Sequence, residues 1–294
     1  MRDQAGCDTE VGVAQQLPPA VMKIVLGNEL ARQRVEAGLK QDDAAEVLRC
    51  TQQKIAHIES GSGIRPMELD ALLERYGASE TDQAYARDLQ AEGNRRTKRG
   101  AFSTRFRQHM RLLVDMEPSC QRFFSYQAMV VPGLLQTERY MRTLFRAWRP
   151  SPSQEQIDRD TSDRLARQRV LDNTDQQFWF VIDEAALRRT TGSAEIVKEQ
   201  AMWLVEALDR PNVELQIVPF STGYYMGQGH DYSIFGYDTR PPVSIVYLEQ
   251  HDGGTYVDDS KRTTRYLTLW EQQKAAASGP EQTRRFLLDL AGTL

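Results

Sequence analysis

Two neighbouring glutamines, Gln52 and Gln53, carry the most informative chemistry of the sequence. A glutamine amide donates and accepts hydrogen bonds at once, which matches the N6 and N7 atoms of adenine in the major groove of DNA. His57 follows Gln53 by one helical turn, so a helix would present both side chains on one face. These residue types at this spacing predict the reading of base edges by a short helix.

The residues around the glutamines predict the helix that must carry them. Thr51 is a favourable N-cap, and Ile55 and Ile58 would form the buried face of a helix over 52–59. A second short helix, over 41–48, precedes it. Two short helices joined by a turn of three or four residues are typical of a helix-turn-helix. Length and periodicity alone would equally fit a three-helix core with polar glutamines on its surface.

Three further side chains of this region are placed to hold the DNA backbone. Lys54 is long enough to reach a phosphate. Gln41 stands at the start of its helix, where its amide and the helix N-terminus favour a phosphate. Arg65, just beyond the second helix, is expected to hold the backbone as well.

The chain separates into four segments. We expect a flexible tail over 1–19, a helix-turn-helix DNA-binding domain over 20–93, a basic linker or helix over 94–115, and a C-terminal domain over 116–294. The fold class is mainly α with α+β. The first domain is predicted as a five-helix bundle, with helices over 23–36, 41–48, 52–59, 66–76 and 81–92.

The C-terminal domain is expected to combine helices with a mixed or antiparallel sheet. Strand signals separated by turn residues occur at 178–182, 213–220, 232–237, 243–249 and 255–257. Helices are predicted over 116–129, 134–148, 153–171, 183–189, 193–208, 263–277 and 280–290. Two of these helices are predicted to begin with capping boxes, Ser153 with Gln156 and Ser278 with Glu281.

Composition argues against several classes of protein. The 294 residues are 40% hydrophobic, enough for a core, which argues against a disordered chain. No apolar stretch approaches the roughly 18–20 residues that span a bilayer, and the N-terminus does not have the pattern of a secretory signal. Three separated cysteines, Cys7, Cys50 and Cys120, argue against a disulfide framework or a cysteine zinc site. We expect a cytoplasmic protein that enters no membrane and holds no cofactor or metal.

The net charge of −4, from 37 basic and 41 acidic residues, is unevenly distributed. Residues 20–80 hold eight basic and ten acidic residues, a net −2, whereas 81–111 hold eight and three, a net +5. The basic segment would supply positive charge that the bundle lacks, although a solvated linker would have the same composition. Its candidates for contact with the DNA backbone are Arg95, Arg96, Lys98 and Arg99.

The residues of the N-terminal motif follow a recognisable order. They are Gly38-Leu39-Lys40-Gln41, Ala45, Thr51-Gln52-Gln53-Lys54-Ile55 and Ile58-Glu59-Ser60-Gly61. Over 23–77 the chain thereby closely resembles the Cro/phage-repressor (XRE) family of helix-turn-helix domains. The resemblance implies a phosphate contact for Gln41, a structural acid at Glu59, and base-facing positions for Thr51, Gln52, Gln53 and His57. Arg49 stands where that family usually has a turn glycine, and a bulky residue at positive φ would cost on the order of 1 kcal/mol.

A second set of ordered motifs lies between about residue 100 and the end of the chain. They are Val130-Val131-Pro132-Gly133-Leu134-Leu135-Gln136-Thr137 with Tyr140, Arg164-Leu165-Ala166-Arg167-Gln168, Asp183-Glu184-Ala185-Ala186-Leu187-Arg188-Arg189, and Val218-Pro219-Phe220 with Gly223. They look like the C-terminal domain of actinobacterial WhiJ-like regulators, although Ala101-Phe102 stands where that family usually has a tryptophan pair. The resemblance implies control of development or secondary metabolism, often with a small partner protein, and implies no known ligand.

Histidines and carboxylates cluster near the last predicted strands, and such groups can ligate a metal or act in acid–base chemistry. They are His230, Asp231, Glu249, His251, Asp252, Asp258 and Asp259. None has a recognised ligand spacing such as HExxH, and strand ends and turns are usually polar. We therefore expect no enzyme, no catalytic residue and no metal site.

Two other groups of residues are assigned by type. Four arginines are expected at the surface or in salt bridges rather than in an anion-binding site; they are Arg164, Arg167, Arg188 and Arg189. In a predicted loop, Tyr224, Tyr225 and Met226 would form an exposed surface for an effector or a partner.

Together these features predict a sequence-specific DNA-binding transcriptional regulator. One short helix reads few base pairs, so a homodimer on a two-fold operator of double-stranded DNA is expected. The C-terminal domain would dimerise, sense a small molecule or bind a partner protein. An alternative is an antitoxin-like interaction module with autoregulatory DNA binding, which the Arg49 turn and the acidic bundle would favour. A weaker alternative is an enzyme fused to a DNA anchor.

Overall fold

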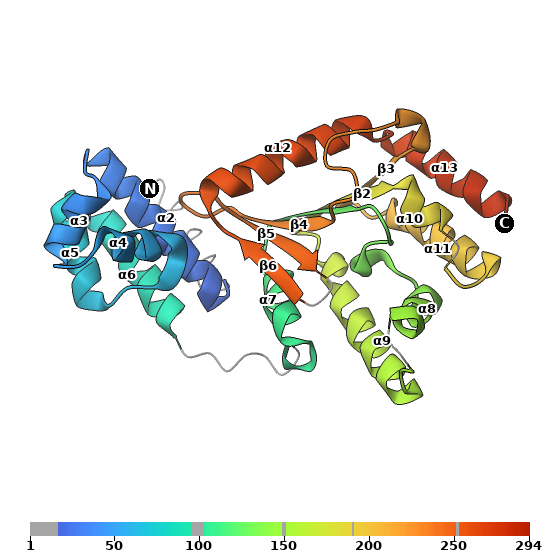
Figure 1. Cartoon of the computed structure of the whole chain (residues 1–294), viewed down its shortest axis with the longest axis horizontal. Coiled ribbons are helices and arrows are strands. Elements are labelled where there is room, and N and C mark those ends of the chain that lie inside the picture. The colour runs from blue at the N-terminus through green and yellow to red at the C-terminus, as the bar shows by residue number, and fades with distance from the viewer. Residues whose placement is uncertain (1–16, 96–102, 149–150, 190, 251–252) are drawn as a thin grey trace, which may run out of the picture. The chain divides into compact units, whose positions relative to one another are not determined.

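The computed structural model describes residues 17–95, 103–148, 151–189, 191–250 and 253–294. The chain divides into two compact units (Figure 1). The first comprises Met1–Gly100 with two short segments, Gly236–Ser244 and Asp258–Ser260, and the second comprises the remaining residues.

The first unit contains the predicted bundle of five helices. They are α2 (Pro19–Glu36), α3 (Gln41–Val47), α4 (Gln52–His57), α5 (Pro66–Tyr76) and α6 (Glu80–Asn94). A short π-helical segment, η1 (Ile58–Ser62), continues α4. Apolar side chains at helical spacing form the core, with Leu30, Ile55 and Leu73 completely buried.

Helix α2 begins at Pro19, four residues before its predicted start, because proline suits the first helical position and Val21 and Met22 extend the buried face. Leu17 is also buried. The rest of the predicted tail, residues 1–16, lies outside the described residues.

The close approach of α2 to the end of the second short helix requires a glycine. A Cβ atom built on Gly27 would lie 2.5 Å from the backbone oxygen of Glu59 and 2.8 Å from that of Ile58. No side chain fits into that space, so the backbone of α2 sets the position of residues 58–62.

The turn between α3 and α4 keeps its shape with an arginine in the left-handed conformation. Arg49 has a φ of 50°. Its N–H donates to the oxygen of Glu46 at 3.1 Å, and the N–H of Cys50 donates to Ala45 at 2.9 Å, which is the Schellman pattern of a helix C-terminus. The turn therefore keeps the shape that a glycine would allow, and Arg49 adopts it with local backbone strain.

The second unit is built on a six-stranded mixed sheet with the order β3-β2-β1-β4-β5-β6. Its strands are β1 (Arg122–Gln127), β2 (Gln177–Asp183), β3 (Val213–Val218), β4 (Tyr232–Tyr237), β5 (Val243–Gln250) and β6 (Gly253–Val257). Strand β2 pairs in parallel with β1 and β3, whereas β5 and β6 are antiparallel. Parallel neighbours require long crossovers, and helices fill the two crossovers between β1, β2 and β3.

Helices cover both faces of this sheet (Figure 1). They are α7 (Arg111–Met116), α8 (Glu138–Trp148), α9 (Gln154–Gln168), α10 (Glu184–Arg188), α11 (Ala194–Ala207), α12 (Ser260–Ala276) and α13 (Pro280–Gly292). Helix α12 buries Trp270 on one face, against Tyr126 of β1 and Val181 of β2. The fold class of a helical bundle followed by an α+β unit is thereby confirmed.

Two local predictions are wrong. The helix predicted over 116–129 is interrupted, because α7 ends at Met116 and β1 occupies Arg122–Gln127. Strand β1 lies inside the sheet with both Phe123 and Tyr126 buried, so its sequence does not alternate, and its aromatic residues favour a strand.

The second wrong prediction is the capping box at Ser278 and Glu281. Helix α13 starts after Gly279 without a side-chain cap. The N–H of Ser278 instead donates to the oxygen of Ile217 in β3 at 2.8 Å. The capping box of Ser153 with Gln156 is confirmed at the start of α9.

The strain at Arg49 predicts that Arg49→Gly stabilises the bundle. Relief of the left-handed conformation outweighs the greater freedom of glycine in the unfolded chain, so we expect a gain of about 0.5–1 kcal/mol in free energy of unfolding. Urea denaturation followed by far-UV circular dichroism, with hydrogen exchange of the amides of α4, measures it. Gly77→Ala is the matched control, because Gly77 has a φ of 67° with open space around its Cβ position and should lose stability by about 1 kcal/mol. If Arg49→Gly left the free energy of unfolding unchanged or lowered it, Arg49 would not be strained.

Candidate nucleic-acid interface

Helix α4 presents its N-terminal end to solvent while its other face is fixed in the bundle. Thr51 is its N-cap, and its hydroxyl accepts a 3.3 Å hydrogen bond from the N–H of Lys54. Ile55 and Ile58 are buried, as their spacing predicted. The polar positions Thr51, Gln52, Gln53 and His57 are all exposed.

A chain of polar contacts connects this helix to α2. The guanidinium of Arg34 makes two hydrogen bonds, of 2.6 and 2.9 Å, to the carboxylate of Glu59. The same carboxylate accepts a 2.8 Å bond from Nε2 of Gln41, and Oε1 of Gln41 accepts one from Nε2 of Gln52. The orientation of Gln52 therefore depends, through Gln41, on the ion pair of Glu59 with Arg34.

This ion pair is largely shielded from solvent. The side chains of Arg34 and Glu59 are 11% and 9% exposed, and the hydrogen bonds to Glu59 raise the pKa of Arg34. Arg34 also donates to the backbone oxygen of Leu39 at 2.9 Å, which holds the start of the loop before α3. A structural role for Glu59, implied by the family resemblance, agrees with these contacts.

The remaining base-facing candidates are not bound by the rest of the bundle. In the described part of the chain, the side chains of Gln53 and His57 have no hydrogen-bond partner. They lie one turn apart on the exposed face of α4 and are open to a partner from outside.

The candidates for phosphate contact differ in how free they are. Nζ of Lys54 lies 2.6 Å from Oε1 of Glu68, a hydrogen bond that lowers the pKa of this carboxyl. The side chain of Arg65 is 82% exposed and lies 3.6 Å from the same oxygen. Lys54 must share or leave Glu68 to reach a phosphate, whereas Arg65 already extends into solvent.

The basic segment after the bundle is described only in part. Arg95 is exposed and pairs with Glu92 at 3.1 Å, while Arg96, Lys98 and Arg99 lie outside the described residues. In the second unit, Arg105 pairs with Asp163 at 3.4 Å, and Arg111 donates to the backbone oxygen of Phe106 at 3.1 Å. Part of the +5 charge is therefore used within the protein.

The proposed loop surface is only partly exposed. Tyr224 and Met226 are 88% and 61% exposed, but Tyr225 is 8% exposed, and its hydroxyl donates to the carboxylate of Asp183 and bonds that of Tyr126. The prediction of an exposed Tyr225 is wrong: Tyr224 is exposed, whereas its neighbour Tyr225 packs into the core.

The structure describes the acidic and histidine cluster only in part. No group of three or more His, Cys, Asp or Glu side chains among the described residues is placed to hold a metal ion, and His251 and Asp252 lie outside this part of the chain. The fold brings Asp231 and Glu249 into one pocket of the second unit. The expectation that the chain is not an enzyme stays a prediction.

Sequence reasoning missed Arg34, which carries the network. Its signal was present, because Arg34 continues the helical spacing of the apolar residues Leu26 and Leu30. A charged residue on a buried stripe calls for a buried partner, and Glu59 is that partner.

Comparison with known proteins agrees with this division of the chain. A family model described as a helix-turn-helix domain matches residues 25–86. A second model, described as a domain of unknown function (DUF5753), matches residues 110–289. No curated protein and no solved structure matches the chain. Among the described residues no helix is long and apolar enough to cross a membrane.

The network predicts that Glu59→Ala lowers the free energy of unfolding of the bundle by about 2–4 kcal/mol, because it leaves the guanidinium of Arg34 buried without a carboxylate. Denaturation with hydrogen exchange of the bundle amides measures the loss. Asp70→Ala is the control, because Asp70 and Arg87 form an ion pair whose side chains are 54% and 52% exposed. That control should change stability by less than about 0.5 kcal/mol. Equal effects of the two substitutions would show that burial of the pair is unimportant.

Proposed function

Because the chain belongs to the family of the domain of unknown function DUF5753 and carries a helix-turn-helix domain over residues 25–86, we propose that it is a sequence-specific DNA-binding transcriptional regulator. The observation that carries the proposal is the arrangement of glutamines on α4, where Gln52 is held by Gln41 and Gln53 is open to solvent.

The hydrogen bond of Gln52 to Gln41 leaves free the donor and the acceptor that pair with adenine. One N–H of its amide donates to Gln41, so a second N–H and the carbonyl oxygen remain for a base. An N–H donating to N7 and an oxygen accepting from N6 form the bidentate contact of glutamine with adenine. Since Gln41 and Glu59 hold the amide before DNA arrives, little rotamer freedom is lost on binding.

Base contacts need a frame of backbone contacts to fix their register. Arg65, which is exposed, and Lys54, once released from Glu68, would supply these contacts. Gln41 stands at the N-terminus of α3, the position for which the family resemblance implies a phosphate contact.

The shortness of the reading helix supports a dimer. Helix α4 has six residues, a length of about 9 Å at 1.5 Å per residue, and contacts only a few base pairs. Two copies on half-sites about one turn of DNA apart would supply the specificity that one copy lacks. We propose a homodimer on a two-fold operator.

The second unit then serves regulation. The resemblance of its sequence to WhiJ-like actinobacterial regulators supports control of development or secondary metabolism, with an effector or a small partner protein as the signal. A regulator of transcription acts where the DNA lies, which supports a cytoplasmic location.

The acidic balance of residues 20–80, a net −2, favours a second candidate, an antitoxin-like interaction module that binds DNA only to regulate its own expression. This candidate predicts one strong site next to its own coding sequence, whereas the leading proposal predicts several. Mapping of genome-wide binding sites with the intact protein distinguishes the two.

The reading helix predicts the effect of Gln52→Ala with Gln53→Ala. On an operator selected from random DNA with the intact protein, each lost base contact should weaken binding by about 1–3 kcal/mol, while binding to random DNA stays the same. Footprinting and titration at fixed salt measure both. Gln282→Ala, an exposed glutamine of α13, is the matched control and should bind like the unchanged protein. Unchanged operator affinity of the double variant would refute α4 as the reading helix.

The backbone contacts predict a change in salt dependence. Arg65→Ala should weaken binding equally on operator and random DNA and reduce the slope of log K against log salt by about 1, because one phosphate contact releases about one counterion. Arg87→Ala, which removes a cation of α6 paired with Asp70, should leave the slope unchanged. An unaltered slope for Arg65→Ala would place this side chain away from the DNA.

A further inference from the structure

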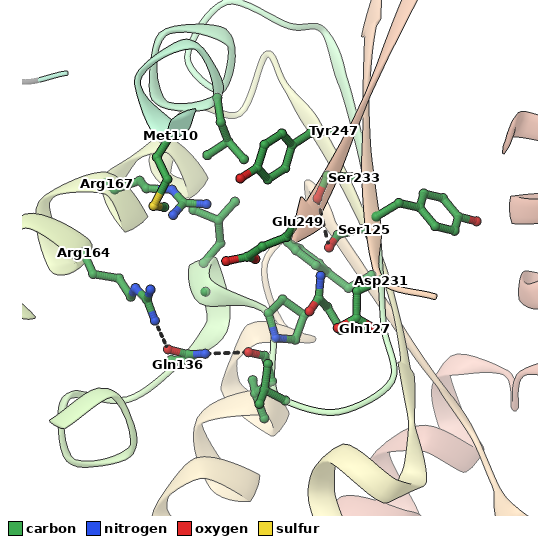
Figure 2. A pocket seen from close by; sticks show the side chains of 18 of the residues that line it. Met110, Ser125, Gln127, Gln136, Arg164, Arg167, Asp231, Ser233, Tyr247 and Glu249 are labelled. Carbon is green, nitrogen blue, oxygen red and sulfur yellow. Dashed lines mark hydrogen bonds between the residues drawn. The ribbon is translucent and has the colours of Figure 1, made fainter. Parts of the chain in front are cut away.

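A pocket opens in the second unit (Figure 2). It contains about 660 Å³ of empty space, part of which is open to solvent. Strands β1, β4 and β5 form one wall, and the loop over 130–136 with α9 forms the facing wall. Every lining residue belongs to the second unit, so the pocket exists independently of the DNA-binding bundle.

Two arginines one turn apart on α9 line this pocket with different partners (Figure 2). Arg167 is neutralised, because its guanidinium makes two 2.6 Å hydrogen bonds to the buried carboxylate of Glu117. Arg164 has no carboxylate within 4.0 Å among the described residues. Its Nη1 donates to Oε1 of Gln136 at 2.6 Å, and its guanidinium carbon lies 4.6 Å from the centre of the Phe145 ring.

Arg164 is therefore a cation without a direct counter-ion that lines the pocket. Loss of solvent, and then repulsion by Arg167, lower its pKa to about 10, so it stays charged at neutral pH. A guanidinium has five N–H donors, and the bond to Gln136 uses one. The amide of Gln136 is itself fixed by a 2.6 Å bond to the oxygen of Val131. The site thus holds free donors in a fixed place.

A second donor faces the same pocket from the sheet. The hydroxyl of Tyr247 on β5 is buried and has no hydrogen-bond partner, and Figure 2 shows it directed toward the arginine side of the pocket. A buried hydroxyl without a partner costs free energy that a ligand oxygen would recover. The hydroxyl can occupy this position only because residue 254 of β6 is a glycine: a Cβ atom there would lie 2.5 Å from the hydroxyl.

Two carboxylates, those of Asp231 and Glu249, line the same pocket. Oδ1 of Asp231 accepts a 2.7 Å bond from the N–H of Ala128, which leaves its second oxygen for another donor. Burial raises the pKa of Asp231, and the nearby charge of Glu249 raises it further. In Figure 2 Asp231 lies across the pocket from Arg164, and the carboxylate of Glu249 lies between them and points toward the arginines. The pocket therefore holds cationic and anionic groups together.

We propose that this pocket binds a small zwitterion, an amino acid or a close derivative, with its carboxylate at Arg164 and Tyr247 and its ammonium group at Asp231 and Glu249. A simple anion would be repelled by the two acids, and a simple cation by the arginines. The proposal does not depend on DNA binding, so its failure and the failure of the proposed function are separate results.

Titration calorimetry on the full-length protein tests the ligand class with named probes. L-Alanine, L-leucine and L-glutamine are each compared with the analogue that lacks the ammonium group and with the amide that lacks the carboxylate. At least one amino acid should bind saturably and raise the melting temperature by about 2–5 °C at ten times its Kd. Both of its analogues should bind at least about tenfold more weakly.

Three substitutions test the placement. Arg164→Gln should abolish detectable binding, and Arg159→Gln, an exposed arginine of the same helix paired with Glu155, should leave it unchanged. Tyr247→Phe removes only an unpartnered oxygen, so the free protein should be as stable as before, while the affinity falls about tenfold.

Three results would overturn the proposal. The first is that none of the amino acids binds saturably up to about 10 mM, a weak affinity even for a small ligand. The second is equal binding of an amino acid and its single-charge analogue. The third is unchanged affinity in both Arg164→Gln and Tyr247→Phe.

Discussion

The ion pair of Arg34 with Glu59 is the contact on which the reading surface depends. It joins the first helix of the bundle to the end of the second short helix, at the place where Gly27 lets the two backbones approach. Its carboxylate also holds Gln41, and Gln41 holds Gln52. The stability of the bundle and the orientation of Gln52 therefore depend on one buried charge pair, and a change at either partner would alter both. A bundle with a net charge of −2 can still present an ordered polar face, because the acid Glu59 is paired with Arg34 and holds Gln41 in place.

Much of the bundle was predictable from the sequence, since short helices with apolar spacing and an N-cap are local features. Thr51, Ile55 and Ile58 occupy the places that their types predict. The conformation of Arg49 was foreseen as a cost at positive φ, and the turn accepts that cost. The partners of Gln41 and Lys54 were not predictable, because Glu59 and Glu68 reach them across loops whose geometry the sequence does not fix.

The second unit shows where local reasoning fails. The sequence of strand β1 does not indicate a strand, because it buries residues on both faces, Phe123 and Tyr126, and so has no period of two. Strands near the other end of the chain, such as β4 at Tyr232–Tyr237, were predicted at their observed bounds because turn residues border them. Arg164 and Arg167 have the same type and share a helix, yet one is neutralised and one is not. That difference comes from Glu117, which lies fifty residues away along the chain.

Gly254 has a consequence for how such a pocket can change. Its missing side chain is the space into which the ring of Tyr247 fits, and the ring forms part of the pocket wall. A larger residue at position 254 would displace the ring and so change the shape of the pocket. Ligand selectivity can therefore drift through the edge of the sheet while every residue that touches the ligand stays the same, so lining residues alone are an incomplete guide to what related chains bind.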